Sequence, residues 1–398
     1  MKFIIYLIMT LSLLFSSLQA KEKFLILAEG NTWRPMMPEN LIENHKRIKK
    51  LPFSGFIMVG NTYTHKVMKP HTKLNYDKVW NEVKGLKGLY KNKHNFFKVN
   101  IHFPADYWDK EAWKQVKNNF TILAKVAKDL DFKGIALDDE VYRDVDRQII
   151  NFKFPTYATL DENSTAWERK GSEKNPTFDE YAYRNPKYTF QEHCNKLTSV
   201  FKEIMEAMVE VNPKFTMLVY HGPALSHENS NKDNQLIVNL GLPRAHELLG
   251  PIFTGLKEGI SKDATLHDMG ESYKYRRDTH FKNSYQWRKY NIAKDKYNND
   301  LNVSYQWIVP KKDRKSWSED VQVGFMVFNK GQKSNYKEFD TRNKSSVNDI
   351  KSTLEKALKY SDKYVLYYYQ EQDWLLPNQE YPLKKGWMEM MKEVYNKK

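Results

Sequence analysis

The stretch KGIALDDEVY, residues 133–142, joins a short apolar run to three consecutive acids. A continuous apolar run is typical of a strand that is covered on both faces, as in a parallel sheet. Successive side chains of a strand point to opposite sides. If the odd-numbered residues Ile135 and Leu137 face helices, then Ala136 and Asp138 face the other side. The stretch therefore predicts a buried parallel strand with acids at its C-terminal end.

Seven further apolar runs occur along the chain, and most are followed by a segment with helical periodicity. These runs are residues 24–28 (FLILA), 55–59 (GFIMV), 97–103 (FKVNIHF), 215–220 (FTMLVY), 264–267 (ATLH), 321–328 (VQVGFMVF) and 364–369 (YVLYYY). Apolar stripes at spacings of three and four predict helices within residues 113–130, 347–358 and 387–394. Eight alternating strand and helix units predict an α/β fold, a single (β/α)8 TIM barrel. An open doubly wound sheet is the alternative, but it usually has fewer strands.

Two connections are too long for plain loops between a strand and the next helix. Residues 143–189 follow strand four and residues 272–320 follow strand six, and both are rich in aromatic side chains. Each leaves the C-terminal end of a strand, where barrel enzymes build their active sites. We therefore expect two long loops that act as lids or as walls of a substrate cleft.

The N-terminus has the pattern of a secretory signal peptide. Lys2 precedes an apolar run at residues 3–15, and Ala20 is a small residue at the expected cleavage point. The run is short for a membrane span. We therefore expect a secreted or periplasmic protein, with residues 1–20 removed and one domain at residues 21–398. After cleavage we expect no stable membrane insertion. The alternative is that residues 1–20 are retained as a signal anchor.

Composition limits the classes of function. The formal net charge is +15, but the lysines are scattered, so a lysine-rich composition explains the charge as well as an anionic polysaccharide substrate does. We expect no nucleic-acid partner. The chain has one cysteine, Cys194, within an amphipathic segment, which predicts a buried small apolar residue and excludes an intrachain disulfide. Neither a P-loop nor a G-x-G-x-x-G or G-x-S-x-G motif is present, so we expect neither a nucleotide cofactor nor serine-hydrolase chemistry.

The acids after strand four are the first candidates for catalysis. Asp138 and Glu140 share the side of the strand that faces the barrel interior, and Asp139 lies between them as a candidate substrate contact. Three adjacent acids repel one another, which is expected to raise the pKa of at least one and to suit acid–base chemistry. The structural alternative is a cluster that caps a helix or forms salt bridges.

The acids after strands six and eight supply the predicted partners. Glu271 is the favoured second catalytic carboxyl group, with His267 and Asp268 as substrate contacts before it. Glu371 is the reserve catalytic candidate, and the residues after it, Asp373 and Trp374, are suited to a sugar subsite. A metal site at strand six is the alternative, although no H-x-H or H-E-x-x-H spacing occurs, so we expect no metal. After strand eight the alternative is an acid that caps the last helix.

Polar residues also end the remaining strands. We predict further substrate contacts for them, because several polar side chains on one rim of a barrel are suited to sugar hydroxyls. These candidates are Glu29, Asn61, His102, Tyr142 and His221.

The pattern G-I-x-x-D-x-E-x-Y at residues 134–142 resembles the fourth strand of TIM-barrel glycoside hydrolases. Asp138-x-Glu140 is similar to the D-x-E arrangement of chitinase-like barrels. An aspartate at the end of strand four also resembles the position of the nucleophile in the α-galactosidase-like clan, which places its acid/base on strand six. The chain departs from the clan with glutamates after strands four and seven, because strand seven ends in Phe328-Asn329-Lys330. It also lacks the fuller aspartate-rich chitinase motif. The resemblance implies an exported glycoside hydrolase.

The expected reaction is hydrolysis of a glycosidic bond by two carboxyl groups in general acid–base catalysis. Carboxyl groups about 5 Å apart imply retention, and a separation of about 6.5–9.5 Å implies inversion. One alternative is a polysaccharide lyase, which would use basic residues such as Lys257, Arg276 and Arg277 at the barrel mouth, or a metal-assisted hydrolase. The other alternative is a glycan-binding barrel without catalysis.

Overall fold

The computed structural model describes residues 22–29, 34–69, 72–101, 108–139, 190–223, 249–270, 272, 275–294, 309–330, 346–370, 374–376, 383 and 385–397. Its strands are β1 (Phe24–Glu29), β2 (Gly55–Met58), β3 (Phe96–Asn100), β4 (Gly134–Asp138), β5 (Thr216–Val219), β6 (Thr265–Asp268), β7 (Val321–Val323), β8 (Phe325–Lys330) and β9 (Tyr364–Gln370). The predicted signal peptide lies outside the described residues and stays a prediction.

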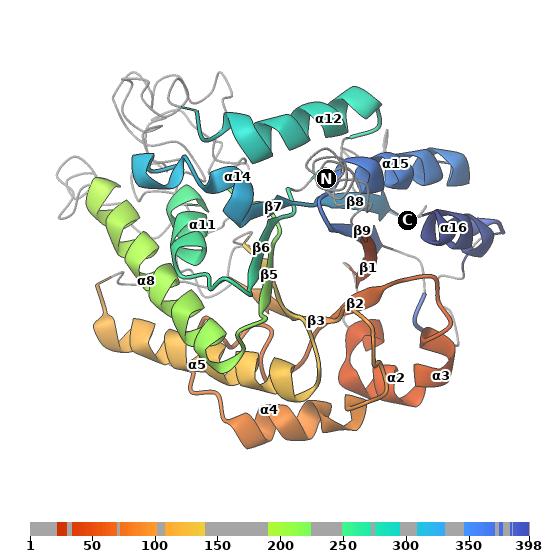
Figure 1. Ribbon diagram of the computed structural model, residues 1–398. Coiled ribbons are helices and arrows are strands. Elements are labelled where there is room, and N and C mark those ends of the chain that lie inside the picture. Colours follow the sequence, from red (N-terminus) through yellow and green to blue (C-terminus); the bar gives the residue numbers. More distant parts are fainter. Residues whose placement is uncertain are drawn as a thin grey trace, which may run out of the picture.

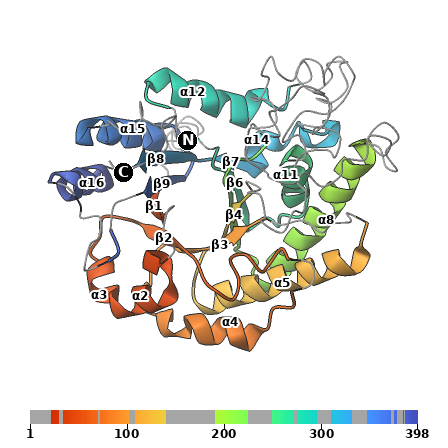
Figure 2. The ribbon, with the colours of Figure 1, turned by 180° about the vertical axis from the view of Figure 1, so that it is seen from behind.

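The helical elements are η1 (Arg34–Met36), α2 (Pro38–Glu43), α3 (His45–Ile48), α4 (Tyr76–Val83), η2 (Lys84–Leu86), α5 (Lys110–Asp129), α8 (Phe190–Val211), α11 (Leu249–Glu258), α12 (Asp278–Gln286), the π-helical turn η5 (Trp287–Asn291), η7 (Lys311–Asp313), α14 (Trp317–Asp320), α15 (Val347–Tyr360) and α16 (Trp387–Asn396). The helices surround the strands on all sides (Figure 1), and the view from behind shows the same ring (Figure 2). None of the described helices is both long and apolar enough to cross a membrane.

All strand pairs are parallel, in the order β7-β6-β5-β4-β3-β2-β1-β9-β8. Since β7 and β8 are consecutive segments separated by a single residue, this order runs round the barrel and returns to the same stretch of chain. The predicted TIM barrel is therefore confirmed.

The seventh strand differs from the prediction, because residues 321–330 form two strands instead of one. β7 pairs with β6, and β8 pairs with β9 on the other side. The two meet at Gly324, where a Cβ atom would lie 2.4 Å from Met269 Cε and 2.8 Å from the Tyr364 carbonyl oxygen. Any side chain would collide with both neighbouring strands. A glycine therefore lets the chain change partners and close the barrel.

The alternation predicted for strand four is confirmed by the packing. Ala136 belongs to a small apolar cluster inside the barrel, with Ile26, Leu218 and Leu366 from other strands. Ile135 and Leu137 belong instead to the larger cluster between the barrel and the helices. A one-residue slip of register would exchange these two sides, so the position of Asp138 follows from the apolar pattern of its strand.

The predicted helices at residues 113–130, 347–358 and 387–394 correspond to α5, α15 and α16, and their apolar stripes face the barrel. Cys194 is fully buried, as expected of a small apolar residue. The predicted long loop after strand six is wrong in part, because α12, η5 and α14 lie within it. Phe281 and Trp317 of this segment are fully buried, so these aromatic side chains pack in the shell and do not line a cleft.

The point of closure is held by two adjacent basic residues of η5. Arg288 donates to the Asp268 carbonyl at 2.9 Å and to the Gly324 carbonyl at 2.7 Å, which connects β6 to the junction of β7 and β8. Lys289 donates to the Val321 carbonyl at 2.7 Å and to Asp362 at 2.9 Å. Together they bind the main chain on both sides of the strand junction.

One polar side chain of α5 anchors the segment that follows β2. Asn119 donates to the carbonyls of Val67 and Thr72, at 3.0 and 2.7 Å, and accepts from the Leu74 N–H at 3.0 Å. Asn119→Ala is expected to lower the free energy of unfolding by about 3 kcal/mol, because it leaves buried main-chain groups unpaired. Urea unfolding measures the loss, and Asn118→Ala, on the exposed side of the same helix, serves as the matched control. Equal stability of the two variants would contradict the assignment.

Candidate functional site

The C-terminal ends of the strands form one rim of the barrel, because every strand runs in the same direction. Asn100 ends β3, Asp138 ends β4 and Asp268 ends β6. We call the polar group inside this rim the mouth cluster; it consists of the buried residues Lys98, Asn100, Asp138 and Tyr220 and the half-buried Tyr368.

Asp138 forms an ion pair inside the barrel. Its Oδ2 lies 2.9 Å from Lys98 Nζ, and the two side chains are 3% and 9% exposed. Lys98 is on β3, opposite Ala136 in the register of the two strands, so it stands two residues before Asp138 on the same face. Its ammonium group therefore reaches along the barrel axis to the carboxylate at the rim.

Two tyrosines and an asparagine complete the mouth cluster. Lys98 Nζ lies 5.5 Å from the centre of the Tyr220 ring. Burial raises the pKa of Tyr220 well above its usual range, with further contributions from Asp138 and Tyr368, so the phenol stays neutral. Asn100 is paired with Asp138 in the register, and its Oδ1 has no hydrogen-bond partner among the described residues. That oxygen is available to accept a hydrogen bond from a hydroxyl group.

Asp139 points away from Asp138 and has its own partner. Its Oδ1 accepts from the His221 main-chain N–H at 2.8 Å and lies 2.9 Å from His221 Nδ1, and both residues are buried. Since the carboxylate accepts, we assign the ring proton to Nδ1. The two described acids of the predicted catalytic run are therefore separated, and Asp139 with His221 ties the ends of β4 and β5 together.

Asp268 faces the helical shell and binds Arg288. Its Oδ1 lies 3.1 Å from Arg288 Nη1 and accepts from the Gly270 N–H at 3.0 Å. Burial raises the pKa of Asp268, and the guanidinium group of Arg288 opposes that rise. Gly222 lies so close that a Cβ atom on it would be 2.5 Å from Asp268 Oδ1. Asp268 is therefore a buried carboxylate held by Arg288 and Gly270, and its role as a substrate contact stays a prediction.

His267 faces the interior below the rim. It is fully buried, its ring meets that of Tyr364 edge-on at 4.8 Å, and its Nε2 lies 3.3 Å from Thr265 Oγ1. Burial lowers the pKa of His267 well below its usual value, and Lys363 and Lys289 lower it further. The imidazole is therefore neutral and packs in the barrel interior, and its role as a substrate contact stays a prediction.

The remaining described candidates divide into one packed and one exposed residue. Trp374 is fully buried against Phe53, Tyr367 and Tyr369, and its predicted role in a sugar subsite stays a prediction. Asn61 has an exposed side chain on a turn after β2, where its N–H donates to Glu82 at 2.7 Å. It keeps its role as a predicted substrate contact.

Several predicted residues lie outside the described part of the chain. These are Glu140, Glu271, Glu371, His102, Tyr142 and Asp373, together with the predicted loop at residues 143–189 and the side chain of Glu29, whose main chain is in β1. Their assignments stay predictions.

Lys257, one of the basic residues named for the lyase alternative, forms ion pairs with two aspartates. Its Nζ lies 2.8 Å from Asp313 and 2.9 Å from Asp320 in the helical shell. Arg276 Nη1 donates to the Tyr275 carbonyl, and Arg277 is exposed before α12. Lys257 therefore cannot serve at the mouth as that alternative requires.

Sequence reasoning did not name Lys98 or Tyr220 as site residues. For Lys98 the sequence did contain a signal. Lys98 is the single charged residue in the apolar run of residues 97–103. Counting alternate residues from Phe96 places it inside the barrel. A lysine at an interior position needs a carboxylate partner, which pointed to Asp138 on the neighbouring strand.

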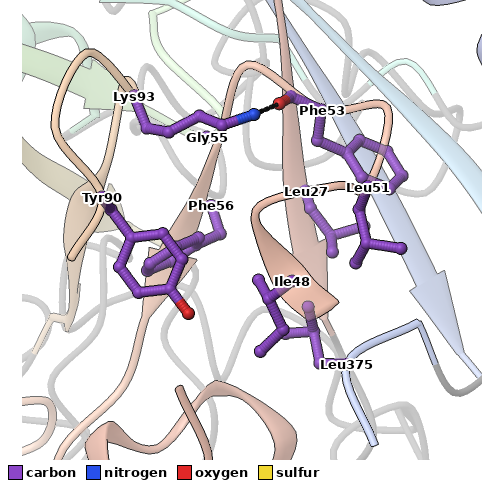
Figure 3. Close-up of a pocket in the computed structure, with 9 residues that line it drawn as sticks. All are labelled: Leu27, Ile48, Leu51, Phe53, Gly55, Phe56, Tyr90, Lys93 and Leu375. Carbon is purple, nitrogen blue, oxygen red and sulfur yellow. Dashed lines mark hydrogen bonds between the residues drawn. The ribbon is translucent and has the colours of Figure 1, made fainter. Parts of the chain in front are cut away.

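Two further features bear on ligands. Within the part of the chain that the structure describes, no three His, Cys, Asp or Glu side chains lie close enough to hold a metal ion. A small apolar pocket lies outside the barrel between β1, β2 and α3, lined by residues such as Leu27, Phe56 and Ile48 (Figure 3). Lys93 closes one side by donating to the Phe53 carbonyl (Figure 3). This pocket is remote from the mouth cluster.

The fold and this rim define a parallel (β/α)8 barrel with a buried ion pair at its C-terminal mouth. No family model and no curated protein matches the sequence. Similar solved structures include TIM-barrel glycoside hydrolases. A family 18 chitinase from Pseudoalteromonas aurantia has 8% identity and a TM-score of 0.38, over 93% of this chain and 99% of that one. A family 5 glycoside hydrolase from Prevotella bryantii has 10% identity and a TM-score of 0.41, over 94% and 96%.

Another similar solved structure is not a glycoside hydrolase. A 3-keto-D-glucoside 4-epimerase from E. coli has 10% identity and a TM-score of 0.38, over 94% of this chain and 100% of that one. At these identities and scores the similarities do not distinguish between activities, so the function has to be argued from the mouth cluster.

Proposed function

We propose that this protein is an exported glycoside hydrolase in which Asp138 is one of two catalytic carboxyl groups. The observation that carries the proposal is the position of Asp138, which ends β4 and faces the barrel interior beside Lys98. Active sites of TIM barrels lie at this end of the strands. Among the described acids at the strand ends, Asp139 and Asp268 are held by His221 and Arg288.

The surroundings of Asp138 are suited to a sugar. Asn100 Oδ1 is an unpaired acceptor on the neighbouring strand, and Tyr220 and Tyr368 supply aromatic rings to the same cluster. Sugars present hydroxyl groups and apolar ring faces, and such mixed pockets, mostly apolar with a few placed polar groups, are typical of small-molecule sites. The second carboxyl group would come from Glu140, Glu271 or Glu371, as the sequence predicts.

The chemistry needs one carboxylate and one carboxylic acid. The acid protonates the glycosidic oxygen as its bond to the anomeric carbon breaks, and the carboxylate either attacks that carbon or removes a proton from the attacking water. Because Asp138 is paired with an ammonium group, we assign it the role of the carboxylate. The net charge of +15 makes carboxylated and sulfated polysaccharides the first substrates to test.

The test is a screen of the chain from residue 21 against neutral, carboxylated and sulfated polysaccharides, with new reducing ends as the readout. The wild type is expected to cleave at least one of them, and Asp138→Asn to lower kcat on it by about 10²–10⁴-fold. Asp131→Asn, at an exposed turn where φ is 60°, is the control and is expected to keep full activity. A wild type that cleaves none, or an Asp138→Asn variant that is fully active, would show the proposal to be wrong.

A further inference from the structure

Lys98 is an unusual residue for the inside of this barrel. At its level the other strands contribute Ile26, Ala136, Leu218 and Leu366, which are all apolar and buried. Burying an ammonium group costs free energy even when it is paired, and an apolar pair of similar volume often gives equal or greater stability. Stability therefore does not explain a lysine here.

The contacts of Lys98 are both directed at the rim. Its Nζ lies 2.9 Å from Asp138 Oδ2 and 5.5 Å from the centre of the Tyr220 ring. Because Lys98 precedes Asp138 by two residues in the register, it reaches the carboxylate from the N-terminal side of the barrel. It orients the carboxylate without standing between Asp138 and the solvent side of the rim.

We propose that Lys98 is a positioning residue that holds Asp138 as an oriented, charged carboxylate, so that the proton for the leaving group comes from another side chain. An ammonium group within a few ångströms favours the ionised form of a carboxyl group. A carboxylate in a charge-assisted contact of this length has no proton to donate. This inference rests on the proposed glycosidase function, and it assigns Asp138 the role of nucleophile or base.

Other groups around Asp138 could also affect its charge. Tyr220, the residue after β5, interacts electrostatically with Asp138 and with Tyr368 on β9. Asp139 follows it in the chain, with His221 as its partner. Tyr220 stays neutral because burial raises its pKa, and Asp139 is a carboxyl group held by His221. Among the groups named here, Lys98 is the one that places an ammonium group against the Asp138 carboxylate.

The pH profile tests this role. Lys98→Met is expected to move the acid limb of kcat/KM to higher pH by about one unit or more, because the ionised carboxylate loses its cation. Lys98→Arg is expected to restore the position of the limb better than Lys98→Gln, since only arginine keeps the charge. If the acid limb of kcat/KM lies at the same pH in the wild type and in all three Lys98 variants, the proposal is overturned.

A matched control separates this effect from a loss of stability. Lys289 is another buried lysine, 2.9 Å from Asp362 and away from the mouth cluster. Lys289→Met is expected to lower stability without moving the acid limb. If it moves the limb as far as Lys98→Met does, the shift is not specific to Asp138 and the proposal is wrong.

Infrared titration tests the same inference without measuring enzyme activity. It uses two Lys98 variants, so the test does not depend on whether Lys98→Met folds. The carboxyl signal of Asp138 is identified as the difference between wild type and Asp138→Asn, and it is then followed in Lys98→Gln and Lys98→Arg. The protonated form is expected to appear at higher pH in the glutamine variant than in the arginine variant. If protonated Asp138 appears at the same pH in Lys98→Gln and Lys98→Arg, the proposed role of Lys98 is refuted. A chain that cleaves no glycan yet shows the expected difference would refute only the glycosidase function.

Discussion

Asp138→Ala is expected to lose about 10³-fold or more of its kcat and to regain part of it in sodium azide. The substitution removes the carboxylate beside Lys98 and leaves a space at the rim next to the ammonium group. Azide is a small anion that can enter this space and attack the anomeric carbon, while the acid still protonates the leaving oxygen. The product is expected to be a glycosyl azide with inverted anomeric configuration, identified by proton NMR.

The configuration of that product decides the role of Asp138. An inverted azide means that azide replaced a nucleophile or a base, as the ion pair with Lys98 indicates. A glycosyl azide with retained configuration would mean that Asp138 is the proton donor, contrary to our assignment. The configuration of the wild-type product then separates the retaining route from the inverting one. Asp131→Asn with the same azide concentration is the control and is expected to form no azide product.

Arg288→Met is expected to lower the free energy of unfolding by about 3–5 kcal/mol, the usual cost of removing one partner of a buried ion pair. Arg288 is 2% exposed and binds the Asp268 carboxylate, the Asp268 carbonyl at the end of β6 and the Gly324 carbonyl at the junction of β7 and β8. Methionine fills part of the volume but leaves the Asp268 carboxylate without its ion-pair partner. Urea unfolding at neutral pH gives the magnitude.

Two comparisons show whether the charge of Asp268 causes this loss. Adding Asp268→Asn to Arg288→Met is expected to recover part of the stability, because the uncompensated charge is gone. Arg277→Met, at an exposed position before α12, is expected to have almost no effect. A double variant that is less stable than Arg288→Met alone would be evidence against this explanation.

The same loss is expected to depend on pH. Burial already raises the pKa of Asp268, and Arg288 limits that rise, so its removal raises the pKa further. A carboxyl group whose pKa is higher in the folded chain than in the unfolded chain favours folding at low pH. The difference in stability between wild type and Arg288→Met should therefore narrow as the pH falls from 7 towards 4.

Much of the fold could be predicted because its signals are local. The apolar runs indicated the strands, and the alternation within residues 134–138 indicated which side of β4 faces the helices. The division of the seventh strand was missed, because the reason for Gly324 is its close approach to Met269, which follows β6, and to Tyr364 on β9. The helices after β6 were missed because aromatic residues there, such as Trp317, were interpreted as a cleft wall.

The candidate site was predicted less completely than the fold. Asp138 lies inside the barrel at the end of β4, as its strand position predicted, and its catalytic role stays a prediction. For Asp268 and Trp374, predicted as substrate contacts, the structure adds buried partners that the sequence did not indicate. Their partners, Arg288 and Phe53, are far from them in the chain, and no local pattern indicates such a pairing. Polar or aromatic character at a strand end therefore did not distinguish a substrate contact from a structural one.

The sequence by itself determined that this chain forms a parallel barrel and that acids stand at the end of its fourth strand, because periodicity and strand alternation depend on neighbours in the chain. Only the tertiary structure decided which acid is paired with which base. Lys98 with Asp138, His221 with Asp139 and Arg288 with Asp268 are contacts between different elements. Such contacts depend on strand register and on the closure of the barrel, and both are properties of the whole chain.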